Sequence, residues 1–161
     1  MKLQIPPDEA WETIRRYAVI PAFDPLIEVP GRGILLVRRR LAPYRGAWAL
    51  PGLRMHRPES VPDTLVRIAR QETGLEIDVD GRVFLGQYVG RFRTEFERHD
   101  LSTGYHVRAT TLAEPRINPE HFTGHRFIAR LDDVPENTGA MYRFYLRNYF
   151  EGRPEAAGDR H

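Results

Sequence analysis

Residues 47–75 read AWALPGLRMHRPESVPDTLVRIARQETGL, and this stretch decides how the fold is interpreted. It begins with a short strand and a loop, and residues 60–73 then have the apolar spacing of a helix. Four apolar side chains share one face of this helix: Val61, Leu65, Ile68 and Ala69. Ser60 and Asp63 resemble a capping box, and Gly74 is a suitable stop. The stretch therefore predicts a unit of strand, loop and helix.

The polar side chains of this unit gather at one end of the predicted sheet. Arg54 and Glu59 lie in the loop, and Arg67, Gln71 and Glu72 lie on the helix. Glu72 falls in the last turn, where the helix dipole disfavours a negative charge by about 0.3–1 kcal/mol. A bound cation would remove that penalty. The alternative is an ordinary exposed acid paired with an arginine, which would contribute little.

The spacing of these residues resembles the Nudix box: Gly, five residues, Glu, seven residues, then Arg-Glu-aliphatic-any-Glu-Glu-any-Gly-aliphatic. Glu72 takes the last acid position, Arg67 the arginine and Glu59 the first acid, without any insertion. Leu53 stands where the first glycine belongs, directly after Gly52. The resemblance implies an α+β Nudix fold, with a mixed β-sheet sandwiched between helices. We expect residues 1–152 to form a single Nudix hydrolase domain.

Two box positions depart from the pattern, because Ile68 and Gln71 replace two of the three helix carboxylates. The GDP-mannose mannosyl hydrolases are similar at these positions. That resemblance covers residues 21–127 and includes the segments AFDPLIEV, GILLVRRRLAPYRGAWALPG and FLGQYVG. It implies hydrolysis of a nucleoside-diphosphate sugar by attack of water on the sugar carbon. One magnesium and a few arginines would neutralise the leaving diphosphate.

The same resemblance assigns the metal ligands. Glu72 and the backbone carbonyl of Gly52 would bind the ion, and Glu120 would fill a third place. The chain has no cysteine, so oxygen ligands or histidine must hold any metal, which favours Mg²⁺, with Mn²⁺ as the alternative.

Substrate-binding roles are also carried by the resemblance. Arg54 would stabilise the leaving diphosphate, and Arg39 would meet the sugar or the phosphates. Asp24 aligns with an acid near the sugar, and Tyr105 with an aromatic near the leaving group, although the order of Tyr105 and His106 is reversed from the family pattern. The competing interpretations are surface charges for the arginines and a turn residue for Asp24.

The candidate general base is His121, within the segment INPEHFTGHRF. Histidine has a suitable unperturbed pKa for proton transfer near neutrality. The spacing to His125 is one residue longer than the family pattern, so His125 is the reserve candidate, and strand packing is its other interpretation. For Trp48, we expect core packing rather than base stacking.

The remaining elements follow from periodicity and turn residues. We expect a helix, a hairpin, several strands, a polar loop, a last helix capped by Asn137 or Thr138, and a disordered tail. These expectations cover residues 7–18 (helix), 20–28 and 33–39 (hairpin), 75–79, 83–93, 105–112 and 127–128 (strands), 99–104 (loop), 139–150 (helix) and 153–161 (tail).

Composition excludes several classes of function. With 161 residues and a formal charge of +2, the chain suits one domain, and its interleaved charges argue against a nucleic-acid groove. The sequence has no membrane-length apolar run and no signal-peptide core, so we expect a cytoplasmic protein without a membrane partner. A homodimer formed through the N-terminal segment stays open.

Three functions remain at this point. The first is the sugar-releasing hydrolase. The second is a conventional Nudix pyrophosphatase, in which Glu120 or another loop acid replaces the lost helix carboxylates. The third is a Nudix-like domain that binds a nucleotide without turnover.

Overall fold

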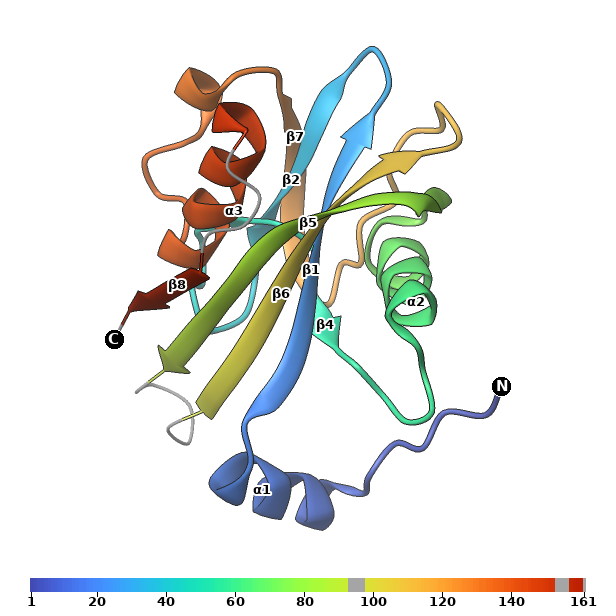
Figure 1. Ribbon diagram of the computed structural model, residues 1–161, viewed down its shortest axis with the longest axis vertical. Helices are drawn as coiled ribbons and strands as arrows, with labels where there is room; N and C mark the ends of the chain where they lie inside the picture. Colours follow the sequence, from blue (N-terminus) through green and yellow to red (C-terminus); the bar gives the residue numbers. More distant parts are fainter. Residues whose placement is uncertain (93–97, 153–156, 161) are drawn as a thin grey trace.

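The computed structural model describes residues 1–92, 98–152 and 157–160 (Figure 1). Its elements are α1 (Asp8–Tyr17), β1 (Ile20–Val29), β2 (Gly33–Arg39), β3 (Trp48–Ala49), β4 (Leu53–Arg54), α2 (Val61–Thr73), β5 (Ile77–Phe92), β6 (Arg98–Ala109), β7 (Phe122–Ile128), η1 (Leu131–Asp133), α3 (Ala140–Glu151) and β8 (Ala157–Arg160). Within these residues the strands form one sheet in the order β3-β2-β1-β6-β5-β8, with β4 paired to β1 and β7 paired to β2.

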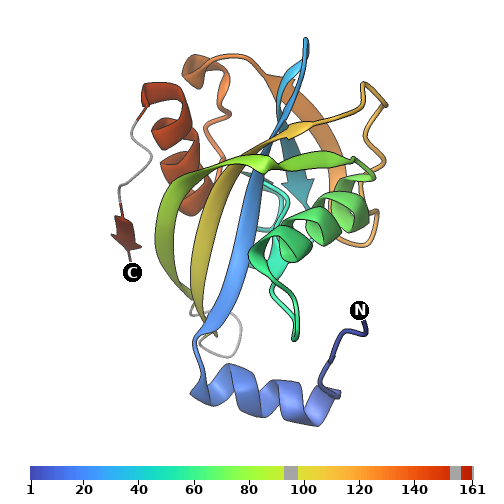
Figure 2. The ribbon, with the colours of Figure 1, turned by 45° about the vertical axis from the view of Figure 1, so that its right-hand side comes forward.

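The sheet is mixed and lies between two helices. β1 runs parallel to β6 and antiparallel to β2, while β5 and β6 are antiparallel. Figures 1 and 2 show α2 on one face of the sheet and α3 on the other. Each helix buries apolar side chains in its own core cluster, Leu65 and Ile68 on the α2 side and Tyr145 and Leu146 on the α3 side. The expected α+β sandwich is therefore confirmed.

Helix α2 begins and ends as its sequence predicts. Ser60 is the N-cap, its Oγ accepts from the Asp63 backbone N–H at 3.2 Å, and the Asp63 carboxylate accepts from the Ser60 N–H at 2.9 Å. Gly74 ends the helix in the left-handed conformation with φ 68°, which glycine adopts without steric cost. The hairpin of β1 and β2 is also confirmed.

The polar loop expected at residues 99–104 is wrong, because these residues lie inside β6. This strand is central in the sheet, and its polar side chains are buried there rather than exposed in a turn, including Asp100 and Ser102. The two strands expected at 75–79 and 83–93 form the single strand β5, with register shifts between Asp78 and Val83 and between Phe84 and Gly86. Arg93 lies outside the described residues.

Two expectations near the C-terminus also need correction. The N-cap of α3 is Gly139, without a side-chain cap hydrogen bond, rather than Asn137 or Thr138. In the tail that we expected to be disordered, residues 157–160 form β8 parallel to β5, and residues 153–156 and 161 lie outside the described part. Edge pairing of this kind uses backbone groups, so the side-chain pattern gave no sign of it.

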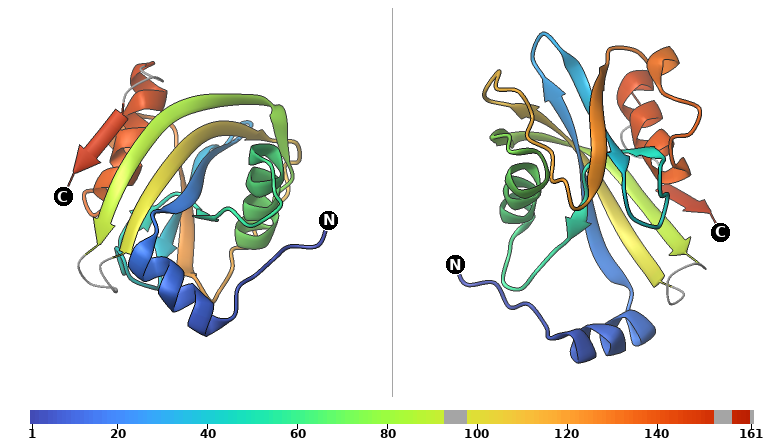
Figure 3. Two further views of the ribbon diagram at one scale, coloured as in Figure 1. Left: turned by 60° about the horizontal axis from the view of Figure 1, so that its bottom comes forward. Right: turned by 180° about the vertical axis from the view of Figure 1, so that it is seen from behind.

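Helix α1 is peripheral. Figure 3 shows it at the end of the molecule where β1 begins, and none of its residues is buried. The segment before it is tied to the rest of the chain by a bridge in which the Gln4 N–H donates to the Arg57 carbonyl at 2.8 Å. No helix among the described residues is long and apolar enough to cross a membrane.

A buried polar cluster joins the centre of the sheet to α3. Asp24 is only 3% exposed and accepts a hydrogen bond from Ser102 Oγ, which lies 2.8 Å from the Tyr145 hydroxyl. Burial raises the pKa of Asp24 to about 7, although the Ser102 hydrogen bond and the positive charge of Arg39 oppose this rise. The folded protein thus binds a proton at Asp24 more tightly than the unfolded chain does.

This raised pKa predicts how stability depends on pH. Between about pH 4 and 7 the native carboxyl resists ionisation, so Asp24 lowers the free energy of unfolding as pH rises, and the effect levels off above about 7. Relative to the unsubstituted protein, Asp24→Asn should therefore gain stability over this range, on the order of 4 kcal/mol. Urea unfolding at a series of pH values, with chelator present, measures it. The exposed Asp80→Asn serves as the control, and a pH-independent difference for Asp24→Asn would contradict the prediction.

Candidate active site

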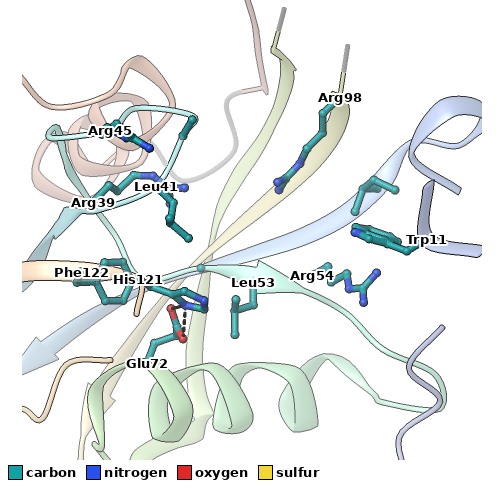
Figure 4. Close-up of a pocket in the computed structure, with 13 residues that line it drawn as sticks. Trp11, Arg39, Leu41, Arg45, Leu53, Arg54, Glu72, Arg98, His121 and Phe122 are labelled. Carbon is teal, nitrogen blue, oxygen red and sulfur yellow. Dashed lines mark hydrogen bonds and ion pairs between the residues drawn. The ribbon is translucent and has the colours of Figure 1, made fainter. Parts of the chain in front are cut away.

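A cavity of about 390 Å³ opens at the end of the sheet beside the C-terminal half of α2 (Figure 4). Its lining comes from segments far apart in the sequence, so folding assembles it: Trp11, Ile20, Arg39, Leu41, Ala42, Arg45, Gly52, Leu53, Arg54, Glu72, Arg98, His121 and Phe122. Five predicted site residues therefore meet here: Arg39, Gly52, Arg54, Glu72 and His121.

Glu72 is the buried carboxylate of this cavity. Its residue exposure is 1%, and His121 Nδ1 lies 2.9 Å from Oε1 and 2.8 Å from Oε2. Asn118 Nδ2 donates to the same Oε1 at 3.1 Å, and the Asn118 backbone N–H donates to the Glu72 carbonyl at 2.9 Å. Sequence reasoning missed Asn118, whose signal was its place three residues before His121.

This arrangement fixes how the imidazole can work. In the neutral imidazole whose proton is on Nδ1, that N–H donates to the Glu72 carboxylate, and Nε2 of His121 is unprotonated and able to accept a proton. A base oriented by a carboxylate is the usual arrangement for activating water. The pair can therefore perform general base catalysis inside the cavity.

Arg54 lies on the opposite side of the cavity from Arg39 (Figure 4). Its guanidinium carbon lies 3.6 Å from the centre of the Trp11 ring, so the planar group stacks on the indole. Burial lowers the pKa of Arg54 from its ordinary value, and the nearby charges of Arg67 and Arg98 lower it further. In the part of the chain that the structure describes, no carboxylate pairs with this guanidinium, so its N–H donors suit an anionic ligand.

Three other arginines line the same cavity. Arg39 donates from Nε to the Pro43 carbonyl at 2.6 Å, and Arg98 pairs with Asp100 at 2.7 Å. Arg45 is the third. Arg45, Arg98 and Trp11 were not predicted, because they come from loop, strand and helix positions that only the tertiary structure brings together.

The first acid and the arginine of the box, Glu59 and Arg67, do not line the cavity but hold the loop beside it. Arg67 forms an ion pair with Glu59, whose side chain is 1% exposed, and Arg67 Nη2 donates to the Arg54 carbonyl at 2.7 Å. Glu59 Oε2 also accepts from the His56 N–H at 2.8 Å and from Thr64 Oγ1 at 3.0 Å. These contacts fix the loop between β4 and α2.

Several predicted residues are not brought to the cavity. Tyr105 packs with the α2-side cluster, its ring stacked on Phe23 with centroids 6.4 Å apart, because its position on β6 faces that side. Glu120 is exposed, and its backbone N–H donates to Asn118 Oδ1 at 3.0 Å. His125 lies on β7, and its Nε2 is 3.4 Å from Glu114 Oε1.

Asp24 lies beneath the cavity rather than in its lining. A Cβ atom added to Gly52 would lie 2.0 Å from Asp24 Oδ1, so only glycine fits above the carboxyl group. This close approach explains the glycine after Pro51. Trp48, as expected, packs against the core of the α3 side.

The donors present fit one divalent cation. Among the described residues no group of three or more His, Cys, Asp or Glu side chains could hold a metal. Glu72 and Gly52 line the same cavity, and a carboxylate retains acceptor capacity beyond its contacts with His121 and Asn118. Magnesium typically uses one or two carboxylates and takes its other ligands from water and substrate phosphate. The cavity thus suits a single ion rather than several.

The chain is similar to several known proteins in sequence and in fold. The "Low-salt glycan biosynthesis protein Agl8" of Haloferax volcanii is 28% identical over 127 residues, which cover 79% of this chain and 69% of that protein. A MutT Nudix hydrolase from Burkholderia pseudomallei has a TM-score of 0.68 and 26% identity, covering 80% of this chain and 95% of its own. The Nudix domain of NrtR from Shewanella oneidensis, solved with ADP ribose, has a TM-score of 0.62 and 18% identity, covering 83% of this chain and 85% of its own. The NUDIX domain family model matches residues 19–148, and the chain therefore belongs to the Nudix family.

Proposed function

We propose that this Nudix domain hydrolyses a nucleoside-diphosphate sugar, with a GDP-mannose-like compound as its substrate, and releases the free sugar and the nucleoside diphosphate. The observation that carries the proposal is the buried Glu72–His121 pair in a cavity lined by four arginines. A cavity with one carboxylate and several guanidinium groups suits an anionic leaving group better than a cluster of metal ions.

The reaction divides between the two sides of the cavity. His121 Nε2 accepts a proton from water, and the water oxygen attacks the sugar carbon that bears the diphosphate. The bond from that carbon to the diphosphate oxygen breaks, and the nucleoside diphosphate leaves with the electron pair. Arg54 and Arg39 stabilise the charge that develops on the leaving oxygen.

A divalent cation, Mg²⁺ by this proposal or Mn²⁺ in its place, would be held by Glu72 and the Gly52 carbonyl and would neutralise the diphosphate. Nudix hydrolases generally use divalent metal ions, and one similar structure, a bifunctional enzyme from Francisella tularensis, contains AMP and a manganese ion. Glu120 is exposed, and a role for it as a ligand would require its side chain to turn toward the cavity.

The comparisons support a substrate of the sugar-nucleotide class. The Haloferax volcanii relative is named for glycan biosynthesis, and the similar NrtR domain was solved with ADP ribose, a nucleoside-diphosphate sugar. The competing pyrophosphatase mechanism needs further carboxylates. In the described residues only Glu72 supplies a carboxylate to the cavity lining, which favours attack at carbon.

The position of the new oxygen atom tests the bond that is cleaved. In water labelled with heavy oxygen, mass spectrometry of the products should find the label in the released sugar, because water attacks carbon. Label in a phosphate group, with a nucleoside monophosphate as product, would instead establish the pyrophosphatase reaction.

Removing the single carboxylate tests the metal-dependent chemistry. Glu72→Gln should lower kcat by at least about 100-fold, because the amide neither binds the cation well nor orients His121. The matched control is Glu76→Gln. Glu76 is an exposed acid just after α2 that pairs with Arg70, and its substitution should keep full activity. If Glu72→Gln turns over normally, the domain does not use this site. If neither the unsubstituted protein nor Glu72→Gln turns over, but both bind nucleotide equally, the domain is a binding module.

Replacing the proposed base tests its role separately. His121→Asn should lower kcat by about 10²- to 10⁴-fold and change KM little, since the histidine acts on water rather than on the bound diphosphate. The control is His125→Asn, because His125 lies on β7, the strand that directly follows His121 in the chain, but outside the cavity lining. Steady-state assays of sugar release compare the two, and equal loss in both would reject the assignment of His121.

A further inference from the structure

A second cavity of about 520 Å³ adjoins the first and lies between the N-terminal segment and the loop after β4. Three residues line both cavities: Trp11, Ile20 and Arg54. The stacked pair of Arg54 and Trp11 therefore stands at the boundary between them. A ligand that contacts Arg54 from the first cavity can continue into the second.

The second cavity has apolar walls and a polar edge. Its walls include Ile14 on α1, Val19 just after α1, and Met55 just after β4. Its polar edge is formed by Gln4 and His56, together with the charged Arg57. Small-molecule sites typically combine mostly apolar walls with a few placed polar groups, in volumes of about 300–1,000 Å³.

His56 is well suited to recognise a flat heterocycle. Burial lowers the pKa of its imidazole, and the charges of Arg67 and Arg54 lower it further, which favours the neutral ring. A neutral imidazole offers one donor and one acceptor nitrogen. The backbone N–H of His56 donates to Glu59 Oε2 at 2.8 Å, so the backbone beneath the ring is fixed.

We infer that the second cavity binds the nucleobase of the substrate, with the diphosphate lying across Arg54 and the sugar beside Glu72 and His121. This inference rests on the proposed function. His56 lies four positions after Gly52, so their Cα atoms are at most about 13 Å apart, and the parts of the two cavities that they line are close enough for one nucleotide to contact both. The apolar walls of the cavity, Ile14, Val19 and Met55 among them, offer stacking surfaces for the base.

The assignment gives the N-terminal segment a function that the box does not explain. Residues 19–148 carry the family match, yet α1 and the segment before it supply one wall of this cavity. Selection among bases would then depend on residues outside the matched region, Gln4 and Trp11 among them. The polar edge of the base faces His56 and Gln4.

Binding of nucleoside diphosphates, compared with inorganic pyrophosphate, tests this site without requiring turnover. Val19→Trp adds an indole to the cavity wall at a position that is 50% exposed, so the fold should tolerate it. By calorimetry with Mg²⁺ present, this variant should bind GDP, ADP and UDP at least about tenfold more weakly, and pyrophosphate within about twofold of the unsubstituted protein. Tyr17→Trp, exposed and outside both cavities, is the matched control.

A second variant keeps the test decisive if the added indole turns to solvent. His56→Ala removes a polar partner of the base and should change the ranking of GDP, ADP and UDP while leaving pyrophosphate affinity unchanged. Equal weakening of pyrophosphate and nucleotides, or no change with any base in both variants, overturns the base site. Failure to hydrolyse sugar nucleotides would refute the proposed function alone, because the binding comparison is independent of catalysis.

Discussion

Burying the Glu72 carboxylate at the end of α2 is costly unless other groups hydrogen-bond to it, because an unpaired charge loses its hydration and the helix dipole opposes it there. The segment after β6 supplies those groups. Asn118 and His121 contact the carboxylate, while the Arg116 and Asn118 backbone N–H groups donate to the Thr73 and Glu72 carbonyls. One segment thus satisfies the last carbonyls of the helix and places the candidate base, so the stability of the helix end and the geometry of the site depend on the same contacts.

Local features of the sequence predicted the elements whose partners lie nearby. The caps of α2 were predicted because Ser60, Asp63 and Gly74 act within a few residues of one another. The strand at residues 99–104 was not, because Ser102 looks like a loop residue until its distant partners are known. Ser102 donates to a carboxyl on β1 and contacts a hydroxyl on α3, and no periodicity in β6 reports such contacts.

The site divides in the same way. Glu72 and His121, which the resemblance to the family singled out through the box and its downstream segment, lie together in one cavity. The resemblance did not reveal Asn118 or Trp11, which matter only through tertiary contacts. Tyr105 was expected near the leaving group and instead packs against the α2 side, because strand alternation decides which face a side chain reaches.

A matching motif position does not by itself establish a catalytic function. Glu59 fits the first acid of the box, yet its oxygens are occupied by Arg67, Thr64 and the His56 N–H, which leaves it as a brace for the loop. Arg67 in turn donates to the Arg54 carbonyl and so helps to fix β4. Glu59 and Arg67 thus hold the loop, whereas Glu72 is the box acid that lines the cavity.

The charge of the cavity follows from this separation. Arg98 pairs with Asp100, and Glu72 is the only carboxylate in the described lining, so the lining itself supplies no counter-ion for Arg54. Burial and the repulsion of Arg67 and Arg98 lower the pKa of Arg54, and an anionic ligand would offset both effects by stabilising the charged guanidinium. Stacking on Trp11 uses the face of the guanidinium and leaves its N–H edge available, so the residue is oriented before the ligand arrives. Less side-chain entropy is then lost on binding, and more of the attraction to a diphosphate appears as affinity.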